Sequence, residues 1–250
     1  MAEPRPAFDP ELFEPLAQVE ERSFWFRARN RLIVSTIARH FPGARSLLEV
    51  GCGSGVVLAA LRDAFPALRL VGGELYAEGL EVARRRLHDV ELVELDARQI
   101  PYDGEFDVVG AFDVLEHVDD DASVLAQMTR AARPGGGVLV LVPQHPWLWS
   151  RYDVAVEHRR RYTRRDLVAK ARRAGLEVEA VTSFVTTLLP AIAAARVADR
   201  FKPETDPLAN LHPGPLNAIF ERLLDGERML VERGVSLPFG GSLLLVGRKP

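Results

Sequence analysis

The chain has 250 residues and a net charge of −3, because 35 acidic side chains nearly balance 32 basic ones. Such a balance provides no global field to attract nucleic acid or an anionic membrane. The single cysteine excludes an intrachain disulfide, and the first residues lack the basic and apolar pattern of a signal peptide, so a cytoplasmic protein is predicted.

Helical spacing of apolar residues marks residues 11–41, which we expect to form one or two helices. Within them, the segment 23–30 combines aromatic and basic side chains. Two interpretations stay open for this segment: a helix that packs on a sheet, or a helix that covers a ligand.

The most informative stretch follows at residues 47–55, where a short apolar strand runs into Gly51, Gly53 and Gly55, and then into a helix over 56–65. Glycine lets the backbone turn sharply and lets a ligand approach helix N–H groups that have no intrahelical partner. The dinucleotide pattern G-x-G-x-x-G fails because Val56 takes its last position. Glu49 lies two residues before Gly51, and its carboxylate would repel a pyrophosphate but not a cationic ligand.

This E-x-G-x-G-x-G pattern resembles motif I of the class I S-adenosylmethionine-dependent methyltransferases, whose cofactor carries an ammonium and a sulfonium. The resemblance implies that Glu49, Gly51, Cys52, Gly53 and Gly55 surround S-adenosylmethionine, and that the N-terminal helices form a cap over it. An ordinary tight turn between a strand and a helix is the competing interpretation.

Acidic residues are expected at the ends of the next two strands. The strand over 68–73 ends at Glu74 and Leu75, and an acid in this place can accept hydrogen bonds from both ribose hydroxyls of an adenosine ligand. After a helix over 77–87, a strand over 90–95 ends at Asp96 and Ala97. The resemblance implies that Asp96 faces the adenine amino group and that Ala97 contributes backbone, whereas a turn or cap would explain Asp96 equally.

A fourth strand begins at residue 106 and ends near Phe112 and Asp113, followed by Glu116 and His117. Ligands of open α/β sheets lie outside the carboxyl ends of the strands, so these four residues are placed for binding or chemistry. The stretch D-V-L-E-H resembles motif IV of small-molecule methyltransferases. The N/D-P-P-Y/F/W tetrad of nucleic-acid aminomethyltransferases is absent, which leaves nucleic acid as a minor alternative acceptor.

Asp113, Glu116 and His117 also invite interpretation as a metal site, because carboxylates and imidazole can hold a divalent cation. Some quinone-pathway and small-RNA methyltransferases use a similar E-x-x-E-H cluster, but here the first acid is Asp and a match to His145 is unproven. A polar turn at a strand end is the simpler interpretation. We therefore predict no obligatory metal.

Acidic residues 119–121 favour a helix that runs to about 132, followed by a P-G-G turn and a fifth strand over 138–142. His145 and two tryptophans follow this strand and form either a substrate wall or packing under a loop. Next, Thr163 begins a T-x-x-D capping pattern, which leaves His158 in the preceding loop. That loop resembles part of an active-site lid of the family, although a run of arginines is often a solvated face.

The remaining chain predicts strands over 176–185 and 241–247, with helices over 188–201 and 216–232 between them. The uncharged run 180–195 is too short to span a bilayer comfortably, so no stable membrane insertion is expected. The predicted fold is a Rossmann-like α/β fold with a mostly parallel seven-stranded sheet, helices on both faces, an N-terminal cap and a helical insertion before the last strand. We expect one methyltransferase domain over 1–250, divided into N-terminal helices (1–42), cofactor-binding core (43–185), helical insertion (186–240) and last strand (241–250).

The expected reaction is in-line displacement at the cofactor methyl by an O, N or C atom of a small acceptor molecule. The apolar helical insertion is compatible with a lipophilic acceptor. Positioning carries most of the rate, and if a base is needed, His117 is the first candidate, followed by His145 and His158. A catalytically inactive cofactor-binding subunit stays an alternative, while Glu49 and Val56 disfavour a nicotinamide oxidoreductase. The oligomeric state stays open, a homodimer included.

Overall fold

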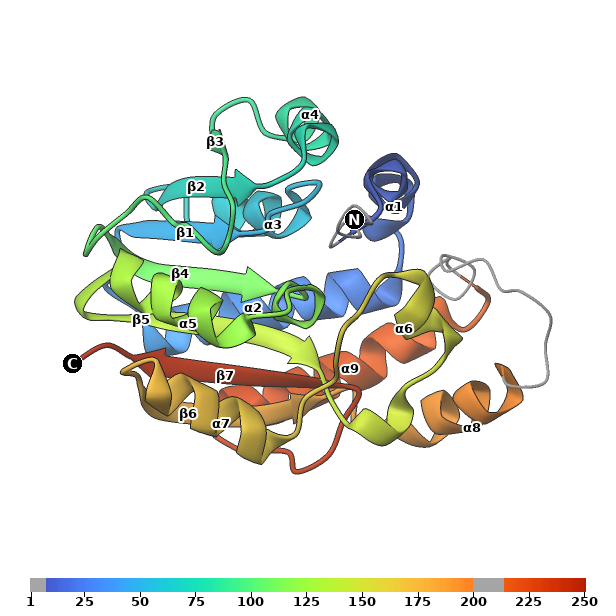
Figure 1. The fold of residues 1–250 in the computed structure, drawn as a ribbon. Helices are drawn as coiled ribbons and strands as arrows, with labels where there is room; N and C mark the ends of the chain where they lie inside the picture. Colours follow the sequence, from blue (N-terminus) through green and yellow to red (C-terminus); the bar gives the residue numbers. More distant parts are fainter. Residues whose placement is uncertain (1–7, 200–213) are drawn as a thin grey trace, which may run out of the picture.

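The structure is a computed structural model that describes residues 8–199 and 214–250. Its centre is a seven-stranded sheet in the order β3-β2-β1-β4-β5-β7-β6 (Figure 1). The strands are β1 (Ser46–Val50), β2 (Arg69–Glu74), β3 (Glu91–Glu94), β4 (Phe106–Phe112), β5 (Ala132–Pro143), β6 (Glu177–Phe184) and β7 (Ser242–Arg248). Only β7 runs antiparallel to its neighbours, β5 and β6. The predicted fold class is thus confirmed.

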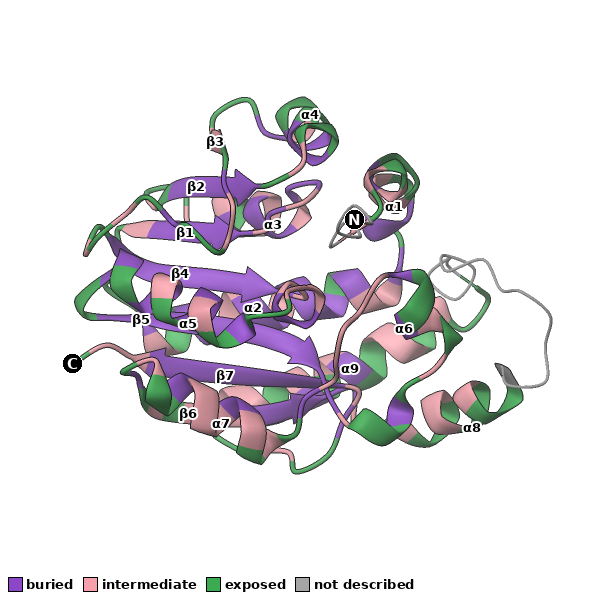
Figure 2. Cartoon of the chain, viewed as in Figure 1, coloured by how far each residue is buried: buried purple, intermediate pink, exposed green. Residues whose placement is uncertain are grey.

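Helices cover both faces of the sheet, because the central strands are apolar on both sides. On one face, the core joins α2 (Phe24–His40), α3 (Val56–Ala64) and α9 (Asn217–Glu232) to inward side chains such as Leu47 and Leu139. On the other, α5 (Asp121–Ala131) and α7 (Arg164–Arg173) pack against Val109 and Val140. Figure 2 shows the result as buried strands between helices that are exposed on their outer sides.

The remaining helices surround the carboxyl ends of the strands. A short turn, η1 (Pro10–Leu12), and α1 (Phe13–Glu20) lie beside α4 (Ala77–Arg86) at the β2–β3 edge. Two short turns, η2 (Leu115–His117) and η3 (Pro146–Leu148), follow β4 and β5, and α6 (Arg151–Ala155) precedes α7. Between β6 and β7 lie α8 (Leu189–Asp199) and α9, as predicted for the insertion. The segment between these two helices lies largely outside the described residues.

Local signals explain several boundaries. Thr163 caps α7, since its side chain accepts a hydrogen bond from Asp166 N at 3.1 Å, as the T-x-x-D pattern predicts. The fifth strand begins at Ala132, six residues earlier than predicted, because the P-G-G segment pairs with the end of the chain: Lys249 N donates to Gly136 O, and Gly135 N donates to Lys249 O. In the part of the chain that the structure describes, no helix is long and apolar enough to cross a membrane.

Candidate functional site

The glycine turn has the backbone that the motif predicts. Gly51, Gly53 and Gly55 all have positive φ, and Gly55 is the N-cap of α3. The N–H groups of Gly51 and Cys52 both donate to Gly73 O, which joins the turn to the end of β2. A Cβ on Gly51 would lie 2.6 Å from Val114 Cγ2, so glycine is required there for space as well as for conformation.

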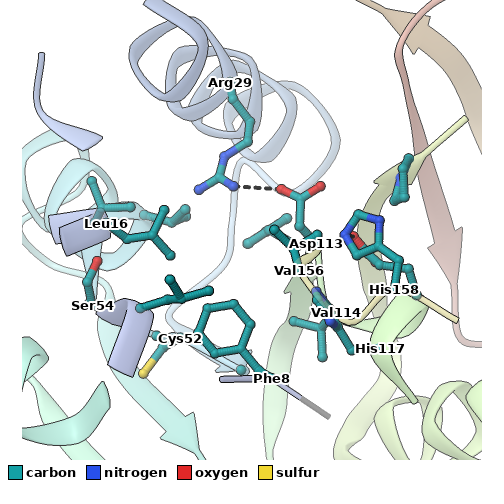
Figure 3. Close-up of a pocket in the computed structure, with 18 of the residues that line it drawn as sticks. Phe8, Leu16, Arg29, Cys52, Ser54, Asp113, Val114, His117, Val156 and His158 are labelled. Atoms are coloured by element: carbon teal, nitrogen blue, oxygen red, sulfur yellow. Dashed lines mark hydrogen bonds and ion pairs between the residues drawn. The ribbon is translucent and has the colours of Figure 1, made fainter. Parts of the chain in front are cut away.

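A cavity of about 640 Å³ opens at the carboxyl ends of the strands, beside this turn (Figure 3). Ten of the eleven predicted cofactor residues line it, namely Glu49, Gly51, Cys52, Gly53, Glu74, Leu75, Asp96, Ala97, Phe112 and Asp113. Among the histidines, His117 and His158 line it too. Gly55 is not among the lining residues; it ends the glycine turn as the N-cap of α3. We call the part near Glu49, Glu74 and Asp96 the acidic end, and the part near His158, Arg159, Arg161 and Arg196 the basic end.

Glu74 organises the acidic end. Its carboxylate accepts hydrogen bonds from the backbone N–H groups of Gly53 at 2.9 Å, Leu75 at 2.8 Å and Tyr76 at 3.1 Å. Burial raises the pKa of Glu74, while these three hydrogen bonds oppose the rise. The carboxylate is therefore fixed at the rim of the glycine turn, where two adjacent strand ends meet.

Asp96 lies at the end of β3 and faces the same cavity. Arg98 holds its carboxylate at 2.6 Å and lowers its pKa, mainly through their side-chain hydrogen bond. Asp96 thus stays ionised as an acceptor, which is what recognition of an amino group by its carboxylate requires.

Glu49 is buried at the bottom of the acidic end, with 2% of its surface exposed. Its Oε2 has no hydrogen-bond partner among the described residues. Burial raises the pKa of Glu49 to about 8; Arg29 opposes this rise, and the charges of Glu20 and Glu74 add to it. A buried carboxyl with an unused oxygen, next to a cavity, is suited to a cationic ligand group.

Arg29 was missed by the sequence analysis as an individual site residue. It reaches from α2 to Asp113, and its Nη1 lies 2.6 Å from Asp113 Oδ2 (Figure 3). The guanidinium also lies over the rings of Trp25 and Phe26, at 4.9 and 5.1 Å from their centroids. The aromatic and basic composition of 23–30 was the available signal, and the structure supports both of its interpretations because α2 packs on the sheet and also lines the cavity.

The N-terminal cap is held over the glycine turn by a polar cluster. Ser54 Oγ donates to Glu20 at the end of α1, and Arg86 from α4 contacts both of them. Phe8, Leu12, Phe13 and Leu16 line the cavity from the same segment. These contacts confirm the predicted cap and close the acidic end from above.

At the basic end, the loop before α7 brings His158 to the cavity. His158 Nδ1 lies 2.9 Å from Asp153 Oδ1, and its Nε2 lies 3.8 Å from Glu116 Oε1. His117 contributes a second ring, whose centroid is 4.8 Å from that of His158. Asp153 was also missed, although the S-x-x-D pattern that starts at Ser150 is a capping signal that would have placed it at the start of a helix.

His145 lies apart from the other two histidines. It is not among the residues that line the cavity; its ring lies between Trp147 and Phe239, at centroid distances of 5.4 and 6.0 Å. Burial, together with the charge of Arg161, lowers its pKa. The tryptophans of this segment do not line the cavity either, and both are exposed, Trp147 at 58% and Trp149 at 37%, so neither a substrate wall nor packing under a loop describes them.

The cluster considered for a metal differs from the predicted one. Asp113 is paired with Arg29, and the three residues whose possible ligand atoms lie within 4.8 Å of one another are Glu116, His117 and His158. Glu116 is fully buried and neither of its oxygens has a hydrogen-bond partner among the described residues. Burial raises its pKa well above the usual range, which favours a neutral carboxyl.

Comparisons with known proteins agree with this geometry. A family model described as a methyltransferase domain matches residues 19–181. A ubiquinone biosynthesis O-methyltransferase of Thiobacillus denitrificans is 38% identical over 100 residues, which are 38% of this chain and 42% of that protein. A probable S-adenosylmethionine-dependent methyltransferase of Mycolicibacterium smegmatis is 30% identical over 162 residues, 64% of this chain and 62% of that protein.

The fold is shared more widely than the sequence. A Haloferax volcanii protein solved in complex with the Trm112 methyltransferase activator superimposes with a TM-score of 0.61 at 20% identity, over 95% of this chain and 97% of that one. The alignments to the two curated relatives named above span about 40 to 60% of the relatives' own lengths. The chain belongs to the class I S-adenosylmethionine-dependent methyltransferase family, as the glycine turn and the acidic strand ends predict.

Proposed function

We propose that this chain transfers the methyl group of S-adenosylmethionine to a small molecule by in-line displacement. The observation that carries the proposal is one continuous cavity in which the acidic end and the basic end are joined past Asp113. When bound, the cofactor supplies an electrophilic methyl group on a sulfonium. The protein's contribution is to hold the cofactor and the acceptor in line, which is worth roughly 7 to 11 kcal/mol.

We assign the acidic end to the cofactor. Asp96 would accept from the adenine amino group and Glu74 from the ribose hydroxyls, each from the end of its strand. Glu49 would face the ammonium of the methionine part, and Arg29 would contact its carboxylate from the cap. The ammonium and the carboxylate of the methionine part would each meet a side chain that can carry the opposite charge.

The acceptor would lie at the basic end. The walls there come from the segments after β4 and β5 and from the insertion, and include Tyr152, Val156, His158, Val185, Ile192 and Arg196. Apolar side chains alternate with cationic ones, which suits a small molecule that carries both an apolar part and a polar group. This composition supports a small-molecule acceptor rather than nucleic acid, and a partly lipophilic acceptor is compatible with it.

The test combines binding with turnover. Calorimetric titration with S-adenosylhomocysteine should give one site, and Gly51→Val should abolish it, whereas the control Gly226→Ala on the open face of α9 should not. Methyl transfer from labelled cofactor is then screened over phenols, hydroxy acids, amines and RNA. Binding without transfer to any of them would favour the inactive cofactor-binding subunit, and transfer to RNA alone would favour the nucleic-acid alternative. Size-exclusion chromatography with light scattering would determine whether a homodimer forms.

A further inference from the structure

His158 is held more rigidly than a loop residue needs to be. Its backbone N–H donates to Asp153 O at 2.8 Å, and its Nδ1 lies 2.9 Å from Asp153 Oδ1. Only 9% of the side chain is exposed. Because Asp153 contacts both the backbone and the ring of His158, the loop delivers this imidazole to the cavity in one orientation.

Ser150 and Arg161 hold the carboxylate of Asp153 in place. Its Oδ2 accepts from the backbone N–H of Ser150 at 2.9 Å and from Ser150 Oγ at 3.1 Å, and its Oδ1 accepts from Arg161 Nε at 2.7 Å. The side chain is fully buried. Although burial raises it, the hydrogen bond from His158 and the charge of Arg161 lower the pKa of Asp153 to about 2. Asp153 is therefore an ionised acceptor at neutral pH.

This arrangement determines the tautomer of His158. An ionised carboxylate can only accept, so the proton of a neutral His158 must lie on Nδ1. Its Nε2 then carries a lone pair, and this nitrogen lies 3.8 Å from Glu116 Oε1, outside hydrogen-bond distance. Among the described residues, Nε2 makes no hydrogen bond, so it is an available acceptor in a residue that lines the basic end of the cavity.

Other titratable groups surround the ring. Tyr152 from α6 meets it edge-on with centroids 6.2 Å apart, and His117 and Glu116 approach from η2. Asp113 at the end of β4 lies on the side that faces Arg29 (Figure 3). Asp153 is thus the carboxylate that contacts this imidazole, and it also accepts from Arg161.

We propose that His158 Nε2 removes the proton of a hydroxyl acceptor, with Asp153 as the positioning residue, so that the reaction is an O-methylation. This rests on the proposed function. The O–H bond breaks with its proton going to Nε2; the oxygen forms a bond to the methyl carbon while the carbon–sulfur bond breaks, and its electron pair stays on sulfur to leave a neutral thioether. A neutral amine already has its lone pair, whereas a hydroxyl gains most from a fixed base.

The first test needs no acceptor. In metal-free protein saturated with S-adenosylhomocysteine, 15N NMR should show His158 with a protonated Nδ1 and an unprotonated Nε2. In Asp153→Asn the side-chain amide can donate to Nδ1, so the proton should move to Nε2, whereas Ser150→Ala should leave the tautomer unchanged. A protonated Nε2 in the neutral ring of the wild-type protein would overturn the proposal.

The second test uses the hydroxyl acceptor identified by the screen. His158→Gln and Asp153→Asn should each lower kcat by at least about 100-fold, with S-adenosylhomocysteine affinity unchanged. The matched control His88→Gln, at an exposed histidine that does not line the cavity, should retain kcat. Full turnover in His158→Gln, or methylation of nitrogen or carbon alone, would refute the assignment. Absence of cofactor binding in the wild-type protein would instead refute the proposed function, and the two failures are thereby distinguished.

Discussion

Glu49 gives the sharpest prediction, because its ionisation should be coupled to cofactor binding. In the folded protein its pKa is raised from 4.5 to about 8, so the carboxyl is largely protonated at pH 7. An ammonium bound beside it would favour the ionised form, and binding should then release a proton. At pH 7 about a tenth of the carboxyl is ionised, so the affinity should be about tenfold below its limit at high pH.

The assay is calorimetric titration of S-adenosylhomocysteine between pH 6.0 and 7.5, in buffers of different ionisation enthalpy. We expect affinity to rise nearly tenfold per pH unit and close to one proton to be released. Glu49→Gln should abolish both effects, whereas Glu94→Gln on the exposed edge strand should preserve them. A pH-independent affinity in the wild-type protein, with no proton release, would refute the assigned role of Glu49.

The same group determines how the stability of the ligand-free protein depends on pH. Because the folded pKa of Glu49 lies above its unfolded value, the folded state binds the additional proton between about pH 4.5 and 8. The stabilisation that this proton gives to the folded state is complete below about pH 4.5 and is lost as pH rises to about 8. Its upper limit is about 5 kcal/mol at 1.36 kcal/mol per pH unit. Urea denaturation should therefore show that Glu49→Gln gains stability relative to wild type as pH rises towards 8.

Three further predictions concern the walls of the site. Gly51→Ala should weaken S-adenosylhomocysteine binding at least about tenfold by titration, since the new Cβ meets Val114, while Gly226→Ala in open space should not. Arg29→Met should lower the free energy of unfolding, measured by urea denaturation, by about 3 kcal/mol, because it leaves Asp113 without its partner. The same substitution should cost less in an Asp113→Asn background, and strictly additive effects of the two substitutions would show that the pair is not coupled. Turnover should survive a chelator, because burial raises the pKa of Glu116 in the cluster with His117 and His158 and favours its neutral form; loss that magnesium restores would contradict this prediction.

The sequence predicted the acidic end of the cavity because its signals are local. Gly51, Glu74 and Asp96 each lie within two residues of the end of a strand, and parallel strands bring their carboxyl ends to one edge of the sheet. The mostly parallel sheet follows from the alternation of helix and strand, whereas the order of its strands was not predicted from the sequence. The residue types and the parallel arrangement of the strands therefore both predict the acidic end at this edge of the sheet.

The contacts of Arg29 and of the basic end could not be predicted in the same way, because they join distant segments. Arg29 and Asp113 are 84 positions apart, and no periodicity pairs them. His145 was a candidate base because the unperturbed pKa of histidine lies near neutrality, but Phe239 from the far end of the chain stacks on it, and it does not line the cavity. Asp153 carried a local signal as a cap, yet its contact with His158 depends on how the loop folds back.

The central claim is that the glycine turn and the two acidic strand ends form a binding site for S-adenosylmethionine. The most direct measurement is a crystal structure of the protein with S-adenosylhomocysteine. We predict the adenine at Asp96, the ribose at Glu74 and the sulfur directed past Asp113 towards His158. Density for the ligand elsewhere, or an empty cavity at millimolar ligand, would contradict the account.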